Sequence, residues 1–325
     1  MNQYVSPRSW LIIISLSAMW GSAFTFIKIA ITGVGPISLV FLRLVIASII
    51  LGLLFLRKEH WNTIRKNLFH IFFIGAANIA MPFFCFAYAA KYINASSMAI
   101  VNGSTPLFAF VFSLLFLGFK FRVNQLFGIT IGIVGLVIFV GSESLEFNLF
   151  PLMLAMLGAG LYGVSMVYMY KYEVLEAKQM SAVTMIAATI LISPFLLTES
   201  ISINIYDYKI VGSIFFLGVF CTGLAYIPYY TLVKRIGPIS TSILAMLVPI
   251  FGMLWAYIFL QEEITLSMIT GCMLIIFGVL LTNLIGNNKT NEEIKMTTPV
   301  TRVEKNGNMT MQFYLPLKFD ENNVP

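Results

Sequence analysis

Two basic side chains lie inside long apolar stretches of this sequence and are its clearest candidates for binding chemistry. Arg43 stands in the run "VFLRLVIASIILGLL" (residues 40–54), and Lys28 follows Trp20 and Phe24 at four-residue spacing, on one face of a helix. An uncompensated cation in mid-membrane costs about 2.5–3.5 kcal/mol. Each cation therefore needs helix-end carbonyls, polar or aromatic side chains, water, or an anionic group on a ligand.

The spacing leaves two interpretations open for each cation. Arg43 is seven residues beyond Pro36, about 10 Å along a helix at 1.5 Å per residue, so its side chain can reach the membrane surface. Lys28 is closer still to the end of its helix. Either both residues are structural tethers, or they make the outer half of a transport pathway electropositive and receptive to a carboxylate.

Aromatic and amide side chains within the same apolar stretches are candidate walls of a binding site. Tyrosine combines a broad apolar face with one hydroxyl group, which suits a small amphipathic ligand. Ordinary packing, or a belt at the membrane interface, is the alternative for any single tyrosine. The predicted substrate-binding set is Trp20, Phe24, Lys28, Arg43, Asn78, Tyr88, Asn102, Tyr162, Tyr226 and Tyr229.

Four prolines fall within the apolar stretches: Pro82, Pro106, Pro228 and Pro249. Proline lacks an N–H group, so each one frees a backbone carbonyl that neighbouring groups or water must satisfy. Static kinks explain them as well as moving hinges do. We predict gating or hinge roles for the four.

Other functional classes lack the residues they need. None of the fourteen acidic residues lies clearly within an apolar stretch, and the only histidines, His60 and His70, lie near the predicted inner surface. Cys85, Cys221 and Cys272 have no metal or redox spacing. We therefore expect no enzyme activity, metal or cofactor. The absence of a Walker-type loop argues against ATP-driven transport. The basic residues do not form the clustered surface that nucleic-acid binding requires.

These candidates sit in a chain whose composition requires a membrane. Of the 325 residues, 59% are hydrophobic and only 10% are charged, and stretches of about 20 apolar residues, enough to cross a bilayer as helix, recur along the chain. The sequence predicts an all-α integral membrane protein. Its ten predicted transmembrane helices lie near residues 10–32, 36–56, 68–90, 95–118, 123–141, 150–170, 179–197, 209–233, 238–260 and 265–285.

Basic residues predict the orientation of these helices. With the amino terminus in the cytoplasm, the inner segments hold sixteen lysines and arginines, whereas the outer segments hold only Lys91 and Lys209. The positive-inside rule then places both termini in the cytoplasm of a multi-pass protein of the cell (inner) membrane.

The chain also contains an internal repeat. The chain can be aligned with itself so that Lys91 falls on Lys234. The same gapless register gives three pairs of identical residues that shape helices: Pro106 with Pro249, Gly128 with Gly271 and Gly135 with Gly278. Five helices per repeat is an odd number, so the second repeat enters the membrane inverted. Inverted repeats are typical of secondary transporters. We predict repeats over residues 1–141 and 142–285.

Several segments resemble the EamA family of the drug/metabolite transporter superfamily. They are "MWGSAFTFIK" (19–28) with "GPISLVFLR" (35–43), the stretch 91–139, and "KRIGPISTSILAMLVPIFGMLWAYIFLQEEIT" within the stretch 234–281. The resemblance covers about residues 10–285. "FLGFKF" in the first half lacks the acidic step that "QEEIT" supplies in the second. The resemblance implies a ten-helix carrier that moves amino acids, other metabolites or drugs, usually outward.

We therefore expect a secondary transporter with a small-molecule substrate and the lipid bilayer as its surroundings. Export of amino acids or related metabolites and drugs by alternating access is the first hypothesis. Uptake or exchange of an anionic or nucleotide-like metabolite is the second, and the sequence leaves monomer and homodimer open. Residues 286–325 read as a polar cytoplasmic tail, either disordered or with a strand in the alternating segment from Met309 to Phe319.

Overall fold

The structure, a computed structural model, describes residues 7–117, 123–143, 149–172, 175–199, 206–241, 243–286, 300–303 and 309–312. Helices dominate the described part. The α-helices are α1 (Pro7–Ala30), α2 (Pro36–Phe55), α3 (Trp61–Lys66), α4 (Leu68–Gly75), α5 (Met81–Ala89), α6 (Ala95–Asn102), α7 (Thr105–Leu117), α8 (Val123–Glu143), α9 (Leu149–Lys171), α10 (Ala177–Ile192), α11 (Tyr208–Phe216), α12 (Ala225–Thr241), α13 (Ile243–Leu260) and α14 (Leu266–Gly286). Short 3₁₀ segments are η1 (Lys58–His60) and η3 (Ser193–Thr198), and π-helical segments are η2 (Ala76–Ala80) and η4 (Leu217–Leu224).

Within the described residues, seven helical stretches are long and apolar enough to cross a membrane. They begin at Trp10, Pro36, Leu68, Ala95, Leu149, Ala177 and Tyr208. Three shorter apolar helical stretches cover residues 127–139, 244–260 and 266–281. These lie where the sequence predicts its fifth, ninth and tenth spans. The helical membrane architecture is confirmed, and the count of ten stays a prediction.

Some predicted spans are interrupted in ways that hydropathy does not reveal. The span 68–90 is α4, η2 and α5 in succession, so a π-helix stands at its centre. The span 95–118 divides into α6 and α7 around a turn at Gly103 and Ser104, just before Pro106. The eighth span also contains a π-helix, η4. It then continues in α12 to Thr241, which corrects the predicted boundary at 233–238.

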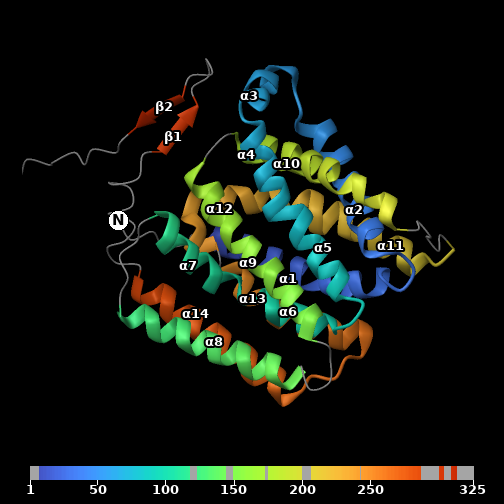
Figure 1. The fold of residues 1–325 in the computed structure, drawn as a ribbon, viewed down its shortest axis with the longest axis vertical. Helices are drawn as coiled ribbons and strands as arrows, with labels where there is room; N and C mark the ends of the chain where they lie inside the picture. Colours follow the sequence, from blue (N-terminus) through green and yellow to red (C-terminus); the bar gives the residue numbers. More distant parts are fainter. Residues whose placement is uncertain are drawn as a thin grey trace, which may run out of the picture.

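Glycines allow the closest helix contacts, and these contacts relate the two repeats. A Cβ atom at Gly21 of α1 would lie 2.7 Å from the Phe251 Cβ of α13. A Cβ atom at Gly163 of α9 would lie 2.8 Å from the Phe108 Cβ of α7. Because Phe108 and Phe251 are paired in the register of the internal repeat, the first helix of each repeat packs on the fourth helix of the other. α1 runs through the middle of the bundle (Figure 1).

Glycines also bring two helices of different repeats into close contact. α8 and α14 lie side by side along one edge of the bundle (Figure 1). A Cβ atom at Gly135 would lie 2.6 Å from the Leu274 Cβ and 2.9 Å from the Gly271 carbonyl oxygen. The outer faces of both helices carry large exposed apolar side chains such as Phe127 and Phe277. Such faces suit lipid tails, which need no polar partner.

The tail contains the only strands among the described residues. β1 (Val300–Val303) pairs antiparallel with β2 (Met309–Gln312), with Val300 opposite Gln312 and Val303 opposite Met309. The all-α prediction therefore holds for the membrane part but not for the tail. The rest of the predicted alternating segment, from residue 313, lies outside the described residues.

Candidate functional site

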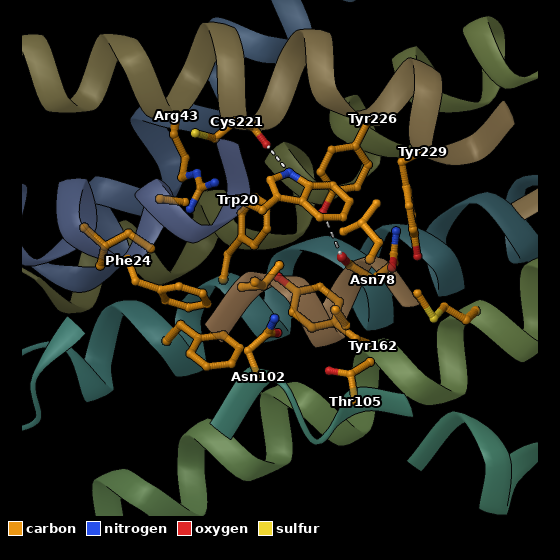
Figure 2. Close-up of a pocket in the computed structure, with 18 residues that line it drawn as sticks. Trp20, Phe24, Arg43, Asn78, Asn102, Thr105, Tyr162, Cys221, Tyr226 and Tyr229 are labelled. Carbon is orange, nitrogen blue, oxygen red and sulfur yellow. Dashed lines mark hydrogen bonds between the residues drawn. The ribbon is translucent and has the colours of Figure 1, made fainter. Parts of the chain in front are cut away.

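A cavity lies in the middle of the helical bundle (Figure 2). It encloses about 700 Å³ of space not filled by atoms, its opening included. Its walls are mostly aromatic and aliphatic. The lining residues are Trp20, Ala23, Phe24, Ile27, Arg43, Asn78, Phe83, Phe86, Asn102, Thr105, Tyr162, Met166, Cys221, Tyr226, Tyr229, Leu244, Ala245 and Val248.

The cavity is built largely from positions that the repeat relates. The register that pairs Lys91 with Lys234 also relates most of the lining residues. At the first helix of each repeat, the sequence offset between the two repeats is one position shorter. Together these offsets link the lining residues in seven pairs. The pairs are Trp20 and Tyr162, Phe24 and Met166, Asn78 and Cys221, Phe83 and Tyr226, Phe86 and Tyr229, Asn102 and Ala245, and Thr105 and Val248. The two repeats therefore contribute matching positions but different chemistry. The first brings Asn78, Asn102 and Thr105, and the second brings the tyrosine hydroxyls of helix α12.

The two π-helices present backbone carbonyls to side chains on other helices. Trp20 Nε1 of α1 donates to the Cys221 carbonyl in η4 at 2.9 Å, and the Tyr226 hydroxyl donates to the Asn78 carbonyl in η2 at 3.3 Å. Asn78 and Cys221 are repeat-related. Pro82 stands four residues after Asn78 and has no N–H to offer its carbonyl. π-Bulges are frequent at functional sites.

The four prolines occupy different places with respect to the cavity. Pro82 lies in the first turn of α5, directly after η2, Pro106 in the first turn of α7, and Pro249 inside α13. The ring of Pro249 packs against Gly103, at the break between α6 and α7. Pro228 lies in α12, between Tyr226 and Tyr229. Hinge roles for all four stay predictions.

Arg43 is the one charged side chain among the described residues that line the cavity. It is 3% exposed, so its side chain lies inside the bundle rather than reaching the membrane surface. Its Nε and Nη2 donate to Thr222 Oγ1 at 3.0 and 2.8 Å, and its guanidinium carbon lies 3.8 Å from the centre of the Phe83 ring. A hydroxyl group and an aromatic face hold the cation without neutralising it.

Two neutral polar groups of the wall have no hydrogen-bond partner within the described part of the chain. They are Asn78 Nδ2 and Thr105 Oγ1, on side chains only 1% and 2% exposed. Asn78 Oδ1 accepts from Ser165 Oγ at 2.8 Å, so the unused group of that amide is a donor. Buried polar groups are almost always paired, and these two are therefore candidates for ligand contacts.

Two of the ten predicted binding residues lie away from the cavity. Lys28 Nζ donates to the carbonyls of Ala90 and Ile93, both at 2.8 Å, in the connection between α5 and α6. Helix-end carbonyls therefore hold this cation. Tyr88 stacks with Tyr92, with ring centres 5.6 Å apart, on the outer side of α5. Lys28 and Tyr88 therefore lie outside the lining of the cavity, and the other eight predicted residues line it together.

Replacing Lys28 by methionine should lower stability and leave substrate affinity within about twofold of the native value. The variant loses two hydrogen bonds from a charged donor, each of which contributes about 1.5–3 kcal/mol. Thermal unfolding of the purified variant in detergent measures this loss. Lys209→Met is the matched control, because Lys209 is exposed at a helix start. Equal stability of the two variants, or a large affinity change in Lys28→Met alone, would contradict the assignment.

Sequence reasoning missed Phe83, Phe86, Thr105, Cys221 and the partner of Arg43, Thr222. The internal repeat holds the signal that would have found most of them. Asn78, Tyr226 and Tyr229 were predicted site residues, and the repeat register points from these to Cys221, Phe83 and Phe86.

Comparison with known families agrees with a fold of two repeats. A model of the EamA-like transporter family matches the chain twice, over residues 8–141 and 149–284. The chain belongs to the EamA-like transporter family. It is therefore a multi-pass membrane transporter rather than an enzyme, with the central cavity as its candidate substrate site.

The curated relatives of this chain are named as transporters without a stated substrate. An uncharacterized transporter of Archaeoglobus fulgidus is 26% identical over 280 residues, covering 84% of this chain and 97% of that protein. The uncharacterized transporter YvbV of Bacillus subtilis is 26% identical, covering 87% and 94%. The uncharacterized inner membrane transporter YedA of Escherichia coli K12 is 25% identical, covering 74% and 79%. A crystal structure with 18% identity superposes with a TM-score of 0.64, covering 86% of this chain and 98% of its own, which supports the fold alone.

A second family model, of SOUL heme-binding proteins, matches residues 254–325. It overlaps the EamA match over α13 and α14. Residues 285–325 contain no histidine or cysteine, two of the usual axial ligands of haem. The described residues there beyond α14 form two four-residue strands that pair with each other.

Proposed function

We propose that this protein is a secondary transporter that exports amino acids or related small metabolites by alternating access of its two repeats. One observation carries the proposal: the central cavity is lined by repeat-related positions and holds a buried Arg43 that has no carboxylate among its described contacts. A transporter must expose one site to each side in turn, and a site shared by two similar halves serves this purpose.

The charge of the cavity supports a substrate with one carboxylate. A buried cation that lacks a counter-charge gains most from a ligand that brings one. The aromatic walls around Trp20, Tyr162 and Tyr226 suit an apolar substrate body. Uptake or exchange of an anionic metabolite is the second candidate, favoured by the same Arg43. A single cation is a poor match for nucleotide-like cargo with several phosphate charges.

We further propose ten membrane-crossing helices with inverted repeats and both termini in the cytoplasm. Helices α8 and α14 have 21 residues each and α13 has 18, or about 27–31 Å of helix, enough to cross the hydrocarbon core. The relative YedA is named as an inner membrane transporter, which supports placement in the inner membrane. The reciprocal packing of Gly21 on Phe251 and Gly163 on Phe108 is what two interlocked repeats would produce.

Carboxylates from the second repeat tie down helix starts of the first repeat at one end of the bundle. Glu262 accepts from the backbone N–H groups of Ala95 and Ser96 at 2.8 and 2.9 Å. Glu199 accepts from the Ser38 N–H at 2.7 Å. The repeat-related positions in the first half are Phe119 and Leu56, which offer no carboxylate. These ties favour the state in which this end, the predicted outer end, is closed.

Glu262→Gln should therefore shift the transporter toward opening at that end. The loss of a charged cap costs about 1–2 kcal/mol, so roughly tenfold in the conformational equilibrium. Alkylation of a cysteine introduced at Ala23 in the cavity, in a background in which the native cavity thiol is removed by Cys221→Ser, would measure the shift. The reagent is membrane-impermeant and is added from that side. The neighbouring Glu263 is exposed and makes no hydrogen bond among the described residues, so Glu263→Gln is the control. Equal alkylation rates in the two variants would contradict the role of Glu262.

Counterflow in proteoliposomes tests the proposed function. Vesicles with the purified full chain are preloaded with a mixture of unlabelled amino acids, organic acids and nucleotides, and uptake of each labelled compound is followed. We expect accelerated exchange of at least one carboxylate-bearing solute. Protein-free vesicles are the control for leakage. If every solute moved at the protein-free rate, the proposal would fail.

A further inference from the structure

The charges that face the cavity distinguish between kinds of carboxylate. This inference rests on the proposed transport function and narrows its cargo from free amino acids to the related metabolites that lack an ammonium group. Arg43 is the only charged side chain among the eighteen that line the cavity within the described residues. An α-amino acid carries two charges, with its ammonium group one carbon atom away from its carboxylate. If the carboxylate binds at Arg43, the ammonium group must lie close to the guanidinium as well.

Nothing described near Arg43 can neutralise such an ammonium group. The groups that contact the guanidinium are the Thr222 hydroxyl and the Phe83 ring. Thr222 Oγ1 already accepts two hydrogen bonds from Arg43, which occupies both of its lone pairs. Cys221 Sγ, also nearby in the wall, is directed to the Met19 carbonyl at 3.3 Å. In a low-dielectric cavity, two cations without an anion other than the shared carboxylate repel each other strongly.

The remaining polar groups of the wall suit a neutral substituent. Arg43 lies at one side of the cavity, and Asn102 and Thr105 lie at the other, with Trp20 and Tyr162 between them (Figure 2). The unpartnered groups are an amide donor on Asn78 and the hydroxyl of Thr105. A hydroxyl, keto or amide group on the ligand can form a hydrogen bond with the amide of Asn78 or with the hydroxyl of Thr105. An ammonium group has no lone pair and cannot accept a hydrogen bond from Asn78 Nδ2.

We propose that the site selects organic monocarboxylates with an apolar or aromatic body and no free α-ammonium group. Hydroxy acids, keto acids and N-acylated amino acids belong to this class. The carboxylate binds the free donors of Arg43, and the body lies between the aromatic walls. A neutral substituent next to the carboxylate places no second cation beside Arg43, and a polar group at the far end of a longer body can meet Asn78 or Thr105. The zwitterionic amino acids of the same shape are poorer substrates.

The test compares 3-phenyllactate with phenylalanine, which differ only by a hydroxyl in place of the ammonium group. Binding to the purified full chain is measured by displacement of labelled 3-phenyllactate, and transport by counterflow with protein-free vesicles as the leakage control. We expect 3-phenyllactate to half-saturate transport at a concentration at least tenfold lower than phenylalanine. Phenethylamine, which has no carboxylate, should neither bind nor exchange.

The same pair of ligands in Arg43→Gln tests the stated cause. Removal of the cation weakens the binding of 3-phenyllactate and relieves the repulsion between Arg43 and the ammonium group of phenylalanine. The preference for 3-phenyllactate over phenylalanine should therefore fall below threefold. Arg43→Lys keeps the charge and should keep the preference. This variant tests the role of the charge if Arg43→Gln does not fold. Glu263→Gln, away from the cavity, should behave as the native protein.

The outcomes separate this inference from the proposed function. Exchange of phenylalanine at a half-saturating concentration equal to or below that of 3-phenyllactate would overturn the inference and leave the protein a transporter. Exchange of other solutes from the broad mixture, with neither aromatic compound moved, would also overturn it. The absence of exchange of any solute would overturn the proposed function itself.

Discussion

Replacing Arg43 by glutamine should raise the half-saturating concentration of a carboxylate substrate about 30-fold. The native guanidinium offers a charge-assisted, two-pronged contact, and its removal costs about 2 kcal/mol of binding free energy. Glutamine keeps a polar group of similar reach, so the change isolates the charge. Counterflow at several substrate concentrations measures the effect.

Stability separates a binding role of Arg43 from a structural one. Arg43 is buried beside a hydroxyl and an aromatic ring with no carboxylate among its described contacts. A buried charge without a counter-charge costs folding free energy, so Arg43→Gln should unfold at the native temperature or above it. Thr222→Val is the companion variant, because it removes the hydrogen-bond partner of Arg43 but keeps the cation. It should weaken substrate binding less than Arg43→Gln does. A loss of stability in Arg43→Gln with unchanged transport would make Arg43 a structural residue.

Replacing Gly163 by alanine should destabilise the protein by about 1–3 kcal/mol, the usual cost of overpacking. A Cβ atom there would lie 2.7 Å from the Ala109 backbone nitrogen and 2.8 Å from the Phe108 Cβ. Neither atom can move without shifting helix α7. Since α7 and α9 both line the cavity, transport should fall together with stability. Thermal unfolding in detergent and counterflow measure the two effects.

Gly160, one turn earlier in α9, is the matched control. A Cβ atom there would meet the same Phe108 at 3.7 Å, an ordinary van der Waals contact. Gly160→Ala should therefore be neutral or slightly stabilising, because alanine favours helix by up to about 1 kcal/mol over glycine. Equal effects of the two substitutions would show that close packing of α7 and α9 is not required. Gly21→Ala, at the repeat-related contact with Phe251, should resemble Gly163→Ala.

Much of the architecture follows from composition and repetition alone. The apolar stretches predict helical spans because an unpaired backbone group in lipid costs several kcal/mol, so only complete helices or closed barrels can cross. The repeat, read from Pro106 and Pro249 and the paired glycines, indicates two halves that form one structure. The candidate binding residues follow from the rarity of polar side chains in these stretches. Eight of the ten, including Trp20 and Arg43, line the cavity.

Tertiary structure decided what each polar group contacts. In a soluble protein a polar face marks the outside of a helix, but lipid tails are as apolar as the protein core, so hydropathy does not show which way a membrane helix faces. For this reason Lys28 and Arg43 read alike in the sequence, although one is held by the carbonyls of Ala90 and Ile93 and the other faces the cavity. The carbonyls of Asn78 and Cys221 in the π-helices likewise accept hydrogen bonds from side chains on distant helices, contacts that no local pattern records. The sequence thus determined a two-repeat membrane transporter and its polar residues, and packing between the repeats decided which of those residues form a site.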